Sequence, residues 1–160
     1  MQEKNAGALF VVAQVVLLVA LALLPGGGDW PTPLWLRWTG LAIGSGGILL
    51  VLVAASKLGS TFTPTPVPLE RGELATTGLY GLVRHPIYSG VLLAVLGLTL
   101  PSGSWTTLTV ALLTFGFFCW KASWEEARLR AKFPGYGEYA DRTPRFVPGL
   151  RRSGRGPGQS

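Results

Sequence analysis

Cysteine and histidine each occur once in the 160 residues of this chain, as Cys119 and His85. A single cysteine cannot form a disulfide within the chain, and one histidine with one cysteine excludes the usual zinc ligand sets. We therefore expect no metal site. Because Cys119 lies inside an apolar run, its position favours a small packing side chain over a nucleophile.

Charged residues are also scarce. They make up 14% of the chain, against 48% hydrophobic residues, which argues against a water-soluble domain of this length. Residues 6–24 and 38–56 contain no ionisable side chain. Each run is long enough, at about 1.5 Å per residue, to cross a hydrocarbon core of about 30 Å. Residues 86–120 are again uncharged, and Pro101-Ser102-Gly103-Ser104 interrupts them with a sequence typical of a tight turn.

The sequence therefore predicts an all-α integral membrane protein with four transmembrane helices, near 6–25, 34–56, 85–101 and 104–121. A cleaved signal peptide is the alternative for the first segment, since Lys4 precedes the apolar run and Ala20-Leu21-Ala22 resembles a cleavage site. That triplet lies inside the run, and three spans would remain in either case. Gln14, within the first span, is most simply explained as an interhelical hydrogen-bond partner.

The basic residues predict the orientation. Most lysines and arginines fall between spans two and three or after span four, and the loops on the other side contain only Arg37. We therefore expect both termini to be cytoplasmic and the protein to lie in the cell inner membrane. The net charge of +6 is then explained by anionic lipid, and no nucleic-acid partner is expected. Residues 1–148 form one predicted domain, followed by a flexible basic tail over 149–160.

The first of two unusual cytoplasmic segments covers residues 57–90. Its prolines 64, 66 and 68 favour an extended run. The start of span three follows, where glycines allow close backbone approach and free N–H groups face an anion. That start is marked by Gly78, Gly81, Arg84, His85, Tyr88 and Gly90.

The second segment begins where span four ends, with adjacent acids at Glu125 and Glu126. Neighbours on a helix diverge by about 100°, so these two side chains are not expected to face one point. A structural explanation stays open: Glu125 and Glu126 could pair with Arg128 on an amphipathic surface helix. Likewise, His85 could act only as a headgroup-level hydrogen-bonding residue and Tyr88 as an interface anchor.

A family resemblance links the two segments. The string from Gly78 to Gly90, which contains Arg84-His85-Pro86-Ile87-Tyr88-Ser89-Gly90, is followed one helical hairpin later by Glu125-Glu126. This pairing resembles the isoprenylcysteine carboxyl methyltransferase and phospholipid methyltransferase superfamily. The closing pattern Tyr136, Tyr139 and Arg145-Phe146-Val147-Pro148 is similar to the end of that family.

The resemblance implies S-adenosylmethionine-dependent methyl transfer at the cytoplasmic membrane face. It implies a cofactor site between the loop before span three and the C-terminal segment, lined by Gly81, His85, Tyr88, Gly90, Glu125 and Glu126. The catalytic residues it implies are His85, Arg84 and Tyr88, with Arg145 and Tyr139 at the substrate. An acid near the positive sulfonium would favour binding, and an arginine or the helix start could take the cofactor carboxylate.

The methyl acceptor is expected to be lipophilic: a prenylcysteine-like carboxylate, a lipid amine or a thiol. Two alternatives stay open. A sterol-reductase-like enzyme would share an Arg-His and a Tyr-x-Gly near the membrane and would use NADPH, although such proteins have more spans. A small non-enzymatic membrane protein would use the same loops only to seal its bundle.

Overall fold

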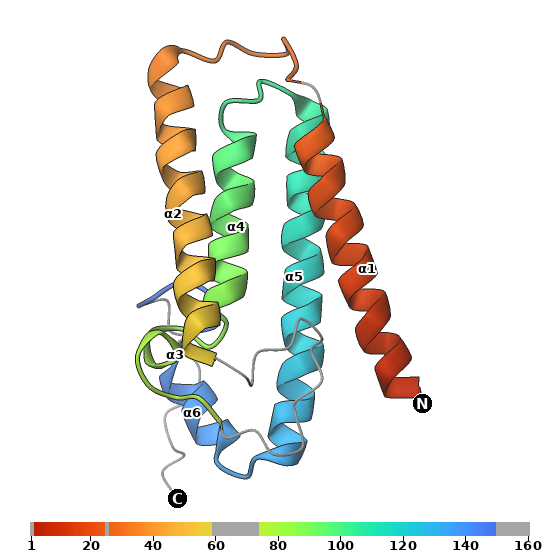
Figure 1. Cartoon of the computed structure of the whole chain (residues 1–160), viewed down its shortest axis with the longest axis vertical. Coiled ribbons are helices and arrows are strands. Elements are labelled where there is room, and N and C mark those ends of the chain that lie inside the picture. Colours follow the sequence, from red (N-terminus) through yellow and green to blue (C-terminus); the bar gives the residue numbers. More distant parts are fainter. Residues whose placement is uncertain (1, 25, 59–73, 150–160) are drawn as a thin grey trace, which may run out of the picture.

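The structure is a computed structural model that describes residues 2–24, 26–58 and 74–149. Six helices occur in these ranges: α1 (Gln2–Leu23), α2 (Leu34–Leu58), α3 (Leu79–Leu82), α4 (Pro86–Thr99), α5 (Trp105–Lys132) and α6 (Tyr136–Arg142). The described ranges contain no strand, which confirms the predicted all-α class. The four long helices run side by side, and α3 and α6 lie toward one end of them (Figure 1). The proline-rich run at 64–68 and the tail beyond residue 149 lie outside the described residues.

Each predicted span corresponds to a helix. Two of these, α1 over Ala6–Leu23 and α2 over Leu34–Lys57, are long and apolar enough to cross a membrane. The third, α4, is apolar but has 14 residues, and Pro86 occupies its first turn, where a missing N–H costs little. The fourth, α5, continues well beyond the predicted end at residue 121, since neither glycine nor proline interrupts the chain until Pro134. Glu125 and Glu126 therefore stand on the same helix as the predicted fourth span.

Glycines allow α2 and α4 to approach each other closely. A Cβ atom added to Gly97 would lie 2.5 Å from the Cα and N atoms of Gly44, and one on Gly47 would lie 2.5 Å from the carbonyl oxygen of Gly90. These neighbours are backbone atoms, which cannot move aside without separating the helices. Small residues at such contacts are typical of helices that pack in a membrane.

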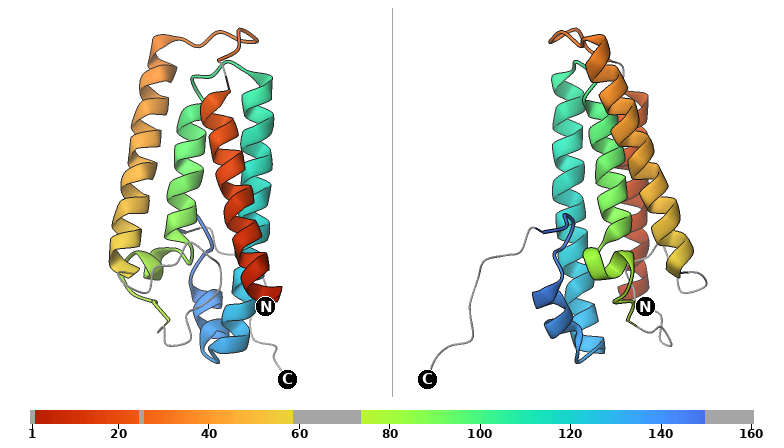
Figure 2. Two further views of the ribbon diagram at one scale, coloured as in Figure 1. Left: turned by 45° about the vertical axis from the view of Figure 1, so that its right-hand side comes forward. Right: turned by 90° about the vertical axis from the view of Figure 1, so that its left-hand side faces the viewer.

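Helix α1 packs against α5, on the side of the bundle away from α2 (Figure 2). The Phe10 ring lies 4.8 Å from the Trp120 ring and 5.1 Å from the Trp124 ring, measured between centroids. One turn further along α1, Gln14 accepts a hydrogen bond from Lys121 of α5. This contact confirms the interhelical role predicted for Gln14.

The loops at one end of the bundle are joined through their backbones. The N–H of Gly27 donates to Ser102 O at 2.8 Å, and that of Asp29 donates to Gly103 O at 3.0 Å. The Asp29 carboxylate then accepts the backbone N–H of Trp105 at 2.8 Å, in the first turn of α5. A carboxylate at a helix start satisfies a free donor and faces the positive end of the helix dipole. Gly103, with φ near 59°, supplies the left-handed turn.

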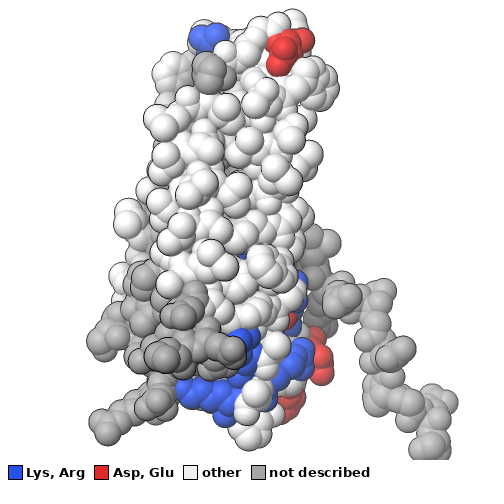
Figure 3. Space-filling view, turned by 90° about the vertical axis from the view of Figure 1, so that its right-hand side faces the viewer, with Lys and Arg blue, Asp and Glu red and all other residues white. Residues whose placement is uncertain are grey.

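The opposite end of the bundle contains most of the charge. Figure 3 shows a long body with almost no charged side chain, a small amount of charge at its upper end, and lysines, arginines and acids gathered toward its lower end. Three parts of the chain meet at this end: the start of α4, the second half of α5, and α6 with the non-helical segment that follows it. The candidate site lies among them.

Candidate functional site

The segment before α4 is held in place by the end of the described chain. The backbone N–H of Arg84 donates to Pro144 O at 2.9 Å, and that of His85 donates to Arg145 O at 3.1 Å. Ser89, on the first turn of α4, donates from its hydroxyl to Phe146 O at 2.7 Å. Residues 84–89 and 144–146 therefore form one hydrogen-bonded unit, although almost 60 positions separate them in sequence.

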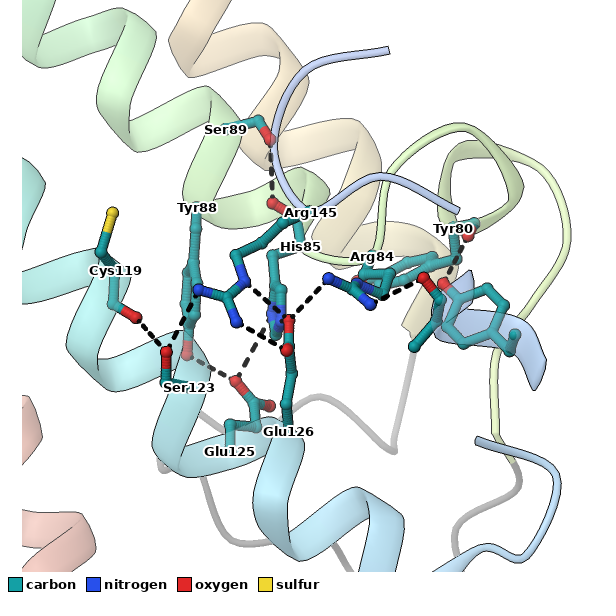
Figure 4. Close-up of polar contacts among 12 residues, drawn as sticks. Tyr80, Arg84, His85, Tyr88, Ser89, Cys119, Ser123, Glu125, Glu126 and Arg145 are labelled. Carbon is teal, nitrogen blue, oxygen red and sulfur yellow. Dashed lines mark hydrogen bonds and ion pairs between the residues drawn. The ribbon is translucent and has the colours of Figure 1, made fainter. Parts of the chain in front are cut away.

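Glu126 is the most heavily paired side chain of the site (Figure 4). Arg145 donates from Nε to Oε1 at 2.9 Å and from Nη2 to Oε2 at 2.7 Å, a bidentate pair. His85 Nε2 lies 3.1 Å and Arg84 Nη2 3.4 Å from Oε1. Burial alone raises the pKa of the Glu126 carboxyl. The hydrogen bonds from His85 and Arg145, with the charges of His85 and Arg84, outweigh that effect and lower its pKa to about 2.

Glu125 has a different environment on the same turn of α5. Its Oε2 atom accepts the Tyr88 hydroxyl at 2.9 Å and lies 3.6 Å from His85 Nδ1. Its side chain is 25% exposed, against 7% for that of Glu126. Both of its polar interactions with described residues use Oε2, and the second oxygen has no hydrogen bond or ion pair with a described residue. Glu126 is thus neutralised by its neighbours, whereas Glu125 keeps an open oxygen.

His85 joins the two acids. Its two ring nitrogens point in different directions, one toward each carboxylate, and its ring stacks on that of Tyr88 with centroids 5.1 Å apart and an interplanar angle of 2°. The prediction that the two acids do not face one point is therefore wrong. Their positions diverge on the helix as expected, but both carboxylates reach the same imidazole ring, each at a different nitrogen.

The tyrosines of α6 are buried against the same unit. The Tyr139 hydroxyl donates to the carbonyl oxygen of Tyr80, and Arg84 donates from Nη1 to Ala140 O at 2.9 Å. Burial raises the pKa of Tyr139 to about 12, with an opposing effect of the Arg84 charge and a supporting one of Glu126. Tyr136 is 1% exposed and its hydroxyl has no hydrogen-bond partner among the described residues. These contacts fasten α6 to the segment before α4.

The structure brings together seven of the nine residues implied by the resemblance: Arg84, His85, Tyr88, Glu125, Glu126, Tyr139 and Arg145. The two glycines lie apart from this network. Gly90 faces α2, where a Cβ would lie 2.6 Å from Gly47 O, so helix packing already explains it. Gly81 is exposed in α3, and its backbone N–H donates to Gly78 O at 3.0 Å. Their predicted cofactor contacts stay predictions.

Sequence reasoning missed two contributors. Ser123 accepts a hydrogen bond from Arg145 Nη1 at 3.1 Å, and it lies one turn before Glu126 on α5. Lys121 lies one turn before Glu125 and contacts the Tyr88 ring, with Nζ 5.2 Å from its centroid. Helical spacing from the acidic pair is the signal that could have identified both, since residues three and four apart share a face.

The described residues contain no group of three histidine, cysteine or acidic side chains placed to hold a metal ion. The site is instead a charge network with one open carboxylate oxygen. Such an arrangement can hold a positively charged ligand and fix its direction.

Comparison with known proteins identifies relatives that are similar to this chain over most of its length. The cobalt-zinc-cadmium resistance protein CzcN of Cupriavidus metallidurans is 33% identical over 85% of this chain and 61% of its own length. The nickel-cobalt-cadmium resistance protein NccN of Alcaligenes xylosoxydans is 30% identical over 85% of this chain and 62% of its own. The protein-S-isoprenylcysteine O-methyltransferase B of Arabidopsis thaliana is 32% identical over 71% of this chain and 60% of its own. The chain thus spans about three fifths of the length of these relatives, and no solved structure matches it.

A family model described as phospholipid methyltransferase matches residues 35–135. The match covers more than half of the chain, from the first turn of α2 to the end of α5, and includes the Arg84-His85-Pro86 segment and both acids. It confirms the family resemblance noted in the sequence: the chain belongs to the phospholipid methyltransferase family.

Proposed function

We propose that the chain is an integral membrane methyltransferase that uses S-adenosylmethionine and binds it at the charged end of the bundle. Membership of the family and the similarity to an isoprenylcysteine O-methyltransferase support the reaction class. One geometric observation supports the proposed location of the cofactor site. The open Glu125 carboxylate stands where the segment before α4, the end of α5 and the chain after α6 are held together.

The side chains of the site fit this cofactor. When bound, S-adenosylmethionine supplies a methyl group activated by a positive sulfonium, so catalysis needs alignment more than a protein nucleophile. Glu125 offers an anionic oxygen to a cationic centre in a partly dry site. Glu126 fits this task poorly, because two arginines and His85 already compensate its charge. We therefore assign cofactor contact to Glu125.

The remaining residues hold Glu125 in place. The Tyr88 hydroxyl donates to its carboxylate, and the His85 ring links Glu125 to the fixed Glu126. Arg145, predicted at the substrate, uses all three of its guanidinium nitrogens on Glu126 and Ser123. We assign Arg145 and Arg84 to positioning rather than to the acceptor. Tyr139, whose hydroxyl is committed to Tyr80 O, has the same role for α6.

The positions of the apolar side chains support a membrane setting. In the apolar stretches of α1 and α2 only 17% of the residues are buried, unlike the core helices of a soluble protein. Large exposed apolar side chains occur on all four long helices, among them Leu9, Trp35, Leu98 and Leu112. Water would penalise this surface and lipid would not. We propose four spans in the inner membrane, with both termini and the charged end cytoplasmic, and a lipophilic acceptor that enters from the bilayer.

Single-cysteine labelling tests the orientation. In a Cys119→Ser background, Gly28→Cys and Gly135→Cys place thiols at opposite ends, at positions where an added side chain meets no described atom within 4 Å. A membrane-impermeant maleimide applied to intact cells should label residue 28 and not residue 135. Labelling of residue 135 alone would reverse the orientation and overturn the cytoplasmic site.

Calorimetry on the purified protein in detergent tests the function. We expect saturable binding of S-adenosylmethionine and none of NADPH, since the two differ too much in size and charge to share one small site. Transfer of labelled methyl to lipid, peptide and small-thiol extracts should accompany that binding. Binding of NADPH alone would replace the methyltransferase with the reductase alternative.

A further inference from the structure

A buried lysine connects the first helix to a tyrosine of the candidate site. Lys121, on α5, is 1% exposed. It donates from Nζ to the amide oxygen of Gln14 on α1, and the same Nζ lies 5.2 Å from the centroid of the Tyr88 ring. The described side chains that meet around Glu126 all come from outside α1. Lys121 thus links α1 to a site in which that helix is not otherwise represented.

Tyr88 is the residue through which this link reaches the acids. Its ring stacks on that of His85, and its centroid lies 5.2 Å from that of Phe118. Its hydroxyl donates to Glu125 Oε2 at 2.9 Å. This hydrogen bond holds one oxygen of the carboxylate whose other oxygen is proposed to face the cofactor. A shift of the Tyr88 ring would therefore move Glu125 as well.

The ammonium group of Lys121 acts on this ring in two ways. It is attracted to the negative face of the ring, and the attraction is stronger where water is excluded. A nearby cation also draws electron density from the phenol, so that the hydroxyl becomes a stronger donor to the carboxylate. The long lysine side chain needs a restraint to keep its ammonium in place, and the amide oxygen of Gln14 supplies one. The charge of Glu125 attracts the ammonium in the same direction.

We propose that Lys121 is a positioning residue of the cofactor site, which acts through the Tyr88 ring to fix the Glu125 carboxylate and thereby couples α1 to cofactor binding. The inference rests on the proposed function and assigns a part in it to α1. Because the action is indirect, loss of the ammonium should weaken cofactor binding only as long as the Tyr88 hydroxyl is present to hold Glu125.

A purely structural role makes a different prediction. Lys121 and Gln14 also hold α1 against α5, so a single substitution leaves one polar group without its partner and lowers stability for that reason alone. The double variant Gln14→Leu/Lys121→Met avoids this loss, because apolar side chains of similar size can replace both members of a polar pair at little cost. Phe10→Leu is the matched control: it weakens the same helix contact at Trp120 and leaves Lys121 in place.

The test measures the affinity for S-adenosylmethionine by calorimetry, and the thermal midpoint of unfolding, for each variant with and without Tyr88→Phe. The double variant should keep a thermal midpoint near that of the wild type and bind S-adenosylmethionine about fivefold more weakly, the scale of one hydrogen bond. In the Tyr88→Phe background it should cause no further loss, because the hydroxyl on which Lys121 acts is already absent. Phe10→Leu should lower the midpoint and keep the wild-type affinity. Gln14→Leu alone, which releases the ammonium from its restraint, should show a smaller loss of affinity.

Several results would overturn the inference. Wild-type affinity in the double variant would leave Lys121 only a structural link between α1 and α5. Tighter binding would show that the ammonium acts directly, by repelling the positive cofactor. An equal loss with and without the Tyr88 hydroxyl would exclude Tyr88 as the intermediary, and an equal loss in Phe10→Leu would assign the effect to the helix contact as a whole. All of these leave the methyltransferase intact. Failure of the wild-type protein to bind S-adenosylmethionine would instead reject the proposed function and this inference with it.

Discussion

The apolar body and the charged end of this molecule are held together by different means. In the body, α2 and α4 meet through glycines whose backbones nearly touch, and almost no charge is present. At the charged end, side chains from three distant segments converge on the Glu126 carboxylate. The first contact depends on shape and is insensitive to pH, whereas the second depends on ionisation. Stability and chemistry should therefore respond to different substitutions.

The largest effect is expected from Glu126→Gln. The substitution keeps the shape of the side chain but leaves Arg84 and Arg145 without their carboxylate, and removal of one member of a buried pair costs roughly 3–5 kcal/mol of unfolding free energy. Thermal unfolding in detergent measures it. Glu138→Gln is the control, because its ion pair with Arg142 has side chains 76% and 68% exposed and should be worth under about 1 kcal/mol. Equal losses of unfolding free energy in the two variants would show that Glu126 contributes no more to stability than an exposed ion pair does.

The stabilisation that Glu126→Gln removes should depend on pH. The folded pKa of Glu126, about 2, is lower than its ordinary value of 4.5. The ionised carboxylate therefore stabilises the folded protein fully above pH 4.5, and this contribution is lost as the pH falls toward 2. The difference in thermal midpoint between wild type and Glu126→Gln should be constant near neutral pH and shrink below 4.5. A difference that stays constant down to pH 2 would contradict the ionic account.

A smaller effect, of about 1–3 kcal/mol, is expected in the body from Gly97→Ala. The added methyl group would meet the Gly44 backbone at 2.5 Å and force α2 away from α4. Gly116→Ala makes the same change on α5 at a position with open space, where replacing a helical glycine should be neutral or stabilising. If Gly97→Ala lowers the unfolding free energy and Gly116→Ala raises it, both independently of pH, close packing of α2 against α4 stabilises the apolar body. Destabilisation by both would point to a general intolerance of alanine.

The smallest effect is expected from Tyr88→Phe, which removes one hydrogen bond to Glu125 and keeps the ring that stacks on His85. The lost hydrogen bond should lower the unfolding free energy by about 1 kcal/mol, seen as a small fall in the thermal midpoint, and should modestly weaken the affinity for S-adenosylmethionine. Calorimetry and thermal unfolding on one preparation measure both quantities. A large fall in the thermal midpoint would show that this tyrosine belongs to the structural network rather than to the ligand site.

The fold was largely predictable because long uncharged runs leave few alternatives to helices. The fourth span was predicted to end near residue 121, whereas the helix that contains it continues to Lys132, because good helix formers follow that position. Nothing in local sequence requires a helix to end where lipid does. The second half of α5, and not a separate segment, carries the acidic pair.

The motif also contains most of the residues that the structure brings together at the candidate site, but it could not predict which of them contact one another. Glu125 and Glu126 are chemically identical neighbours, and only the fold decides that Arg145, 19 positions away, and His85, 41 positions away, converge on Glu126. Lys121 was counted as an orientation signal because its burial beside Tyr88 depends on how α1, α4 and α5 pack. Contacts between distant segments were the missing information in both cases.

The central claim, that Glu125 holds the positive centre of the cofactor, is tested most directly by comparing two ligands. S-adenosylmethionine carries the sulfonium charge, and S-adenosylhomocysteine lacks it. Glu125→Gln should weaken binding of S-adenosylmethionine by roughly ten- to a hundredfold and change that of S-adenosylhomocysteine much less, since only a charge-assisted contact is lost. Glu138→Gln should alter neither. An equal loss for both ligands, or no loss for either, would contradict the assignment of Glu125 to the cofactor.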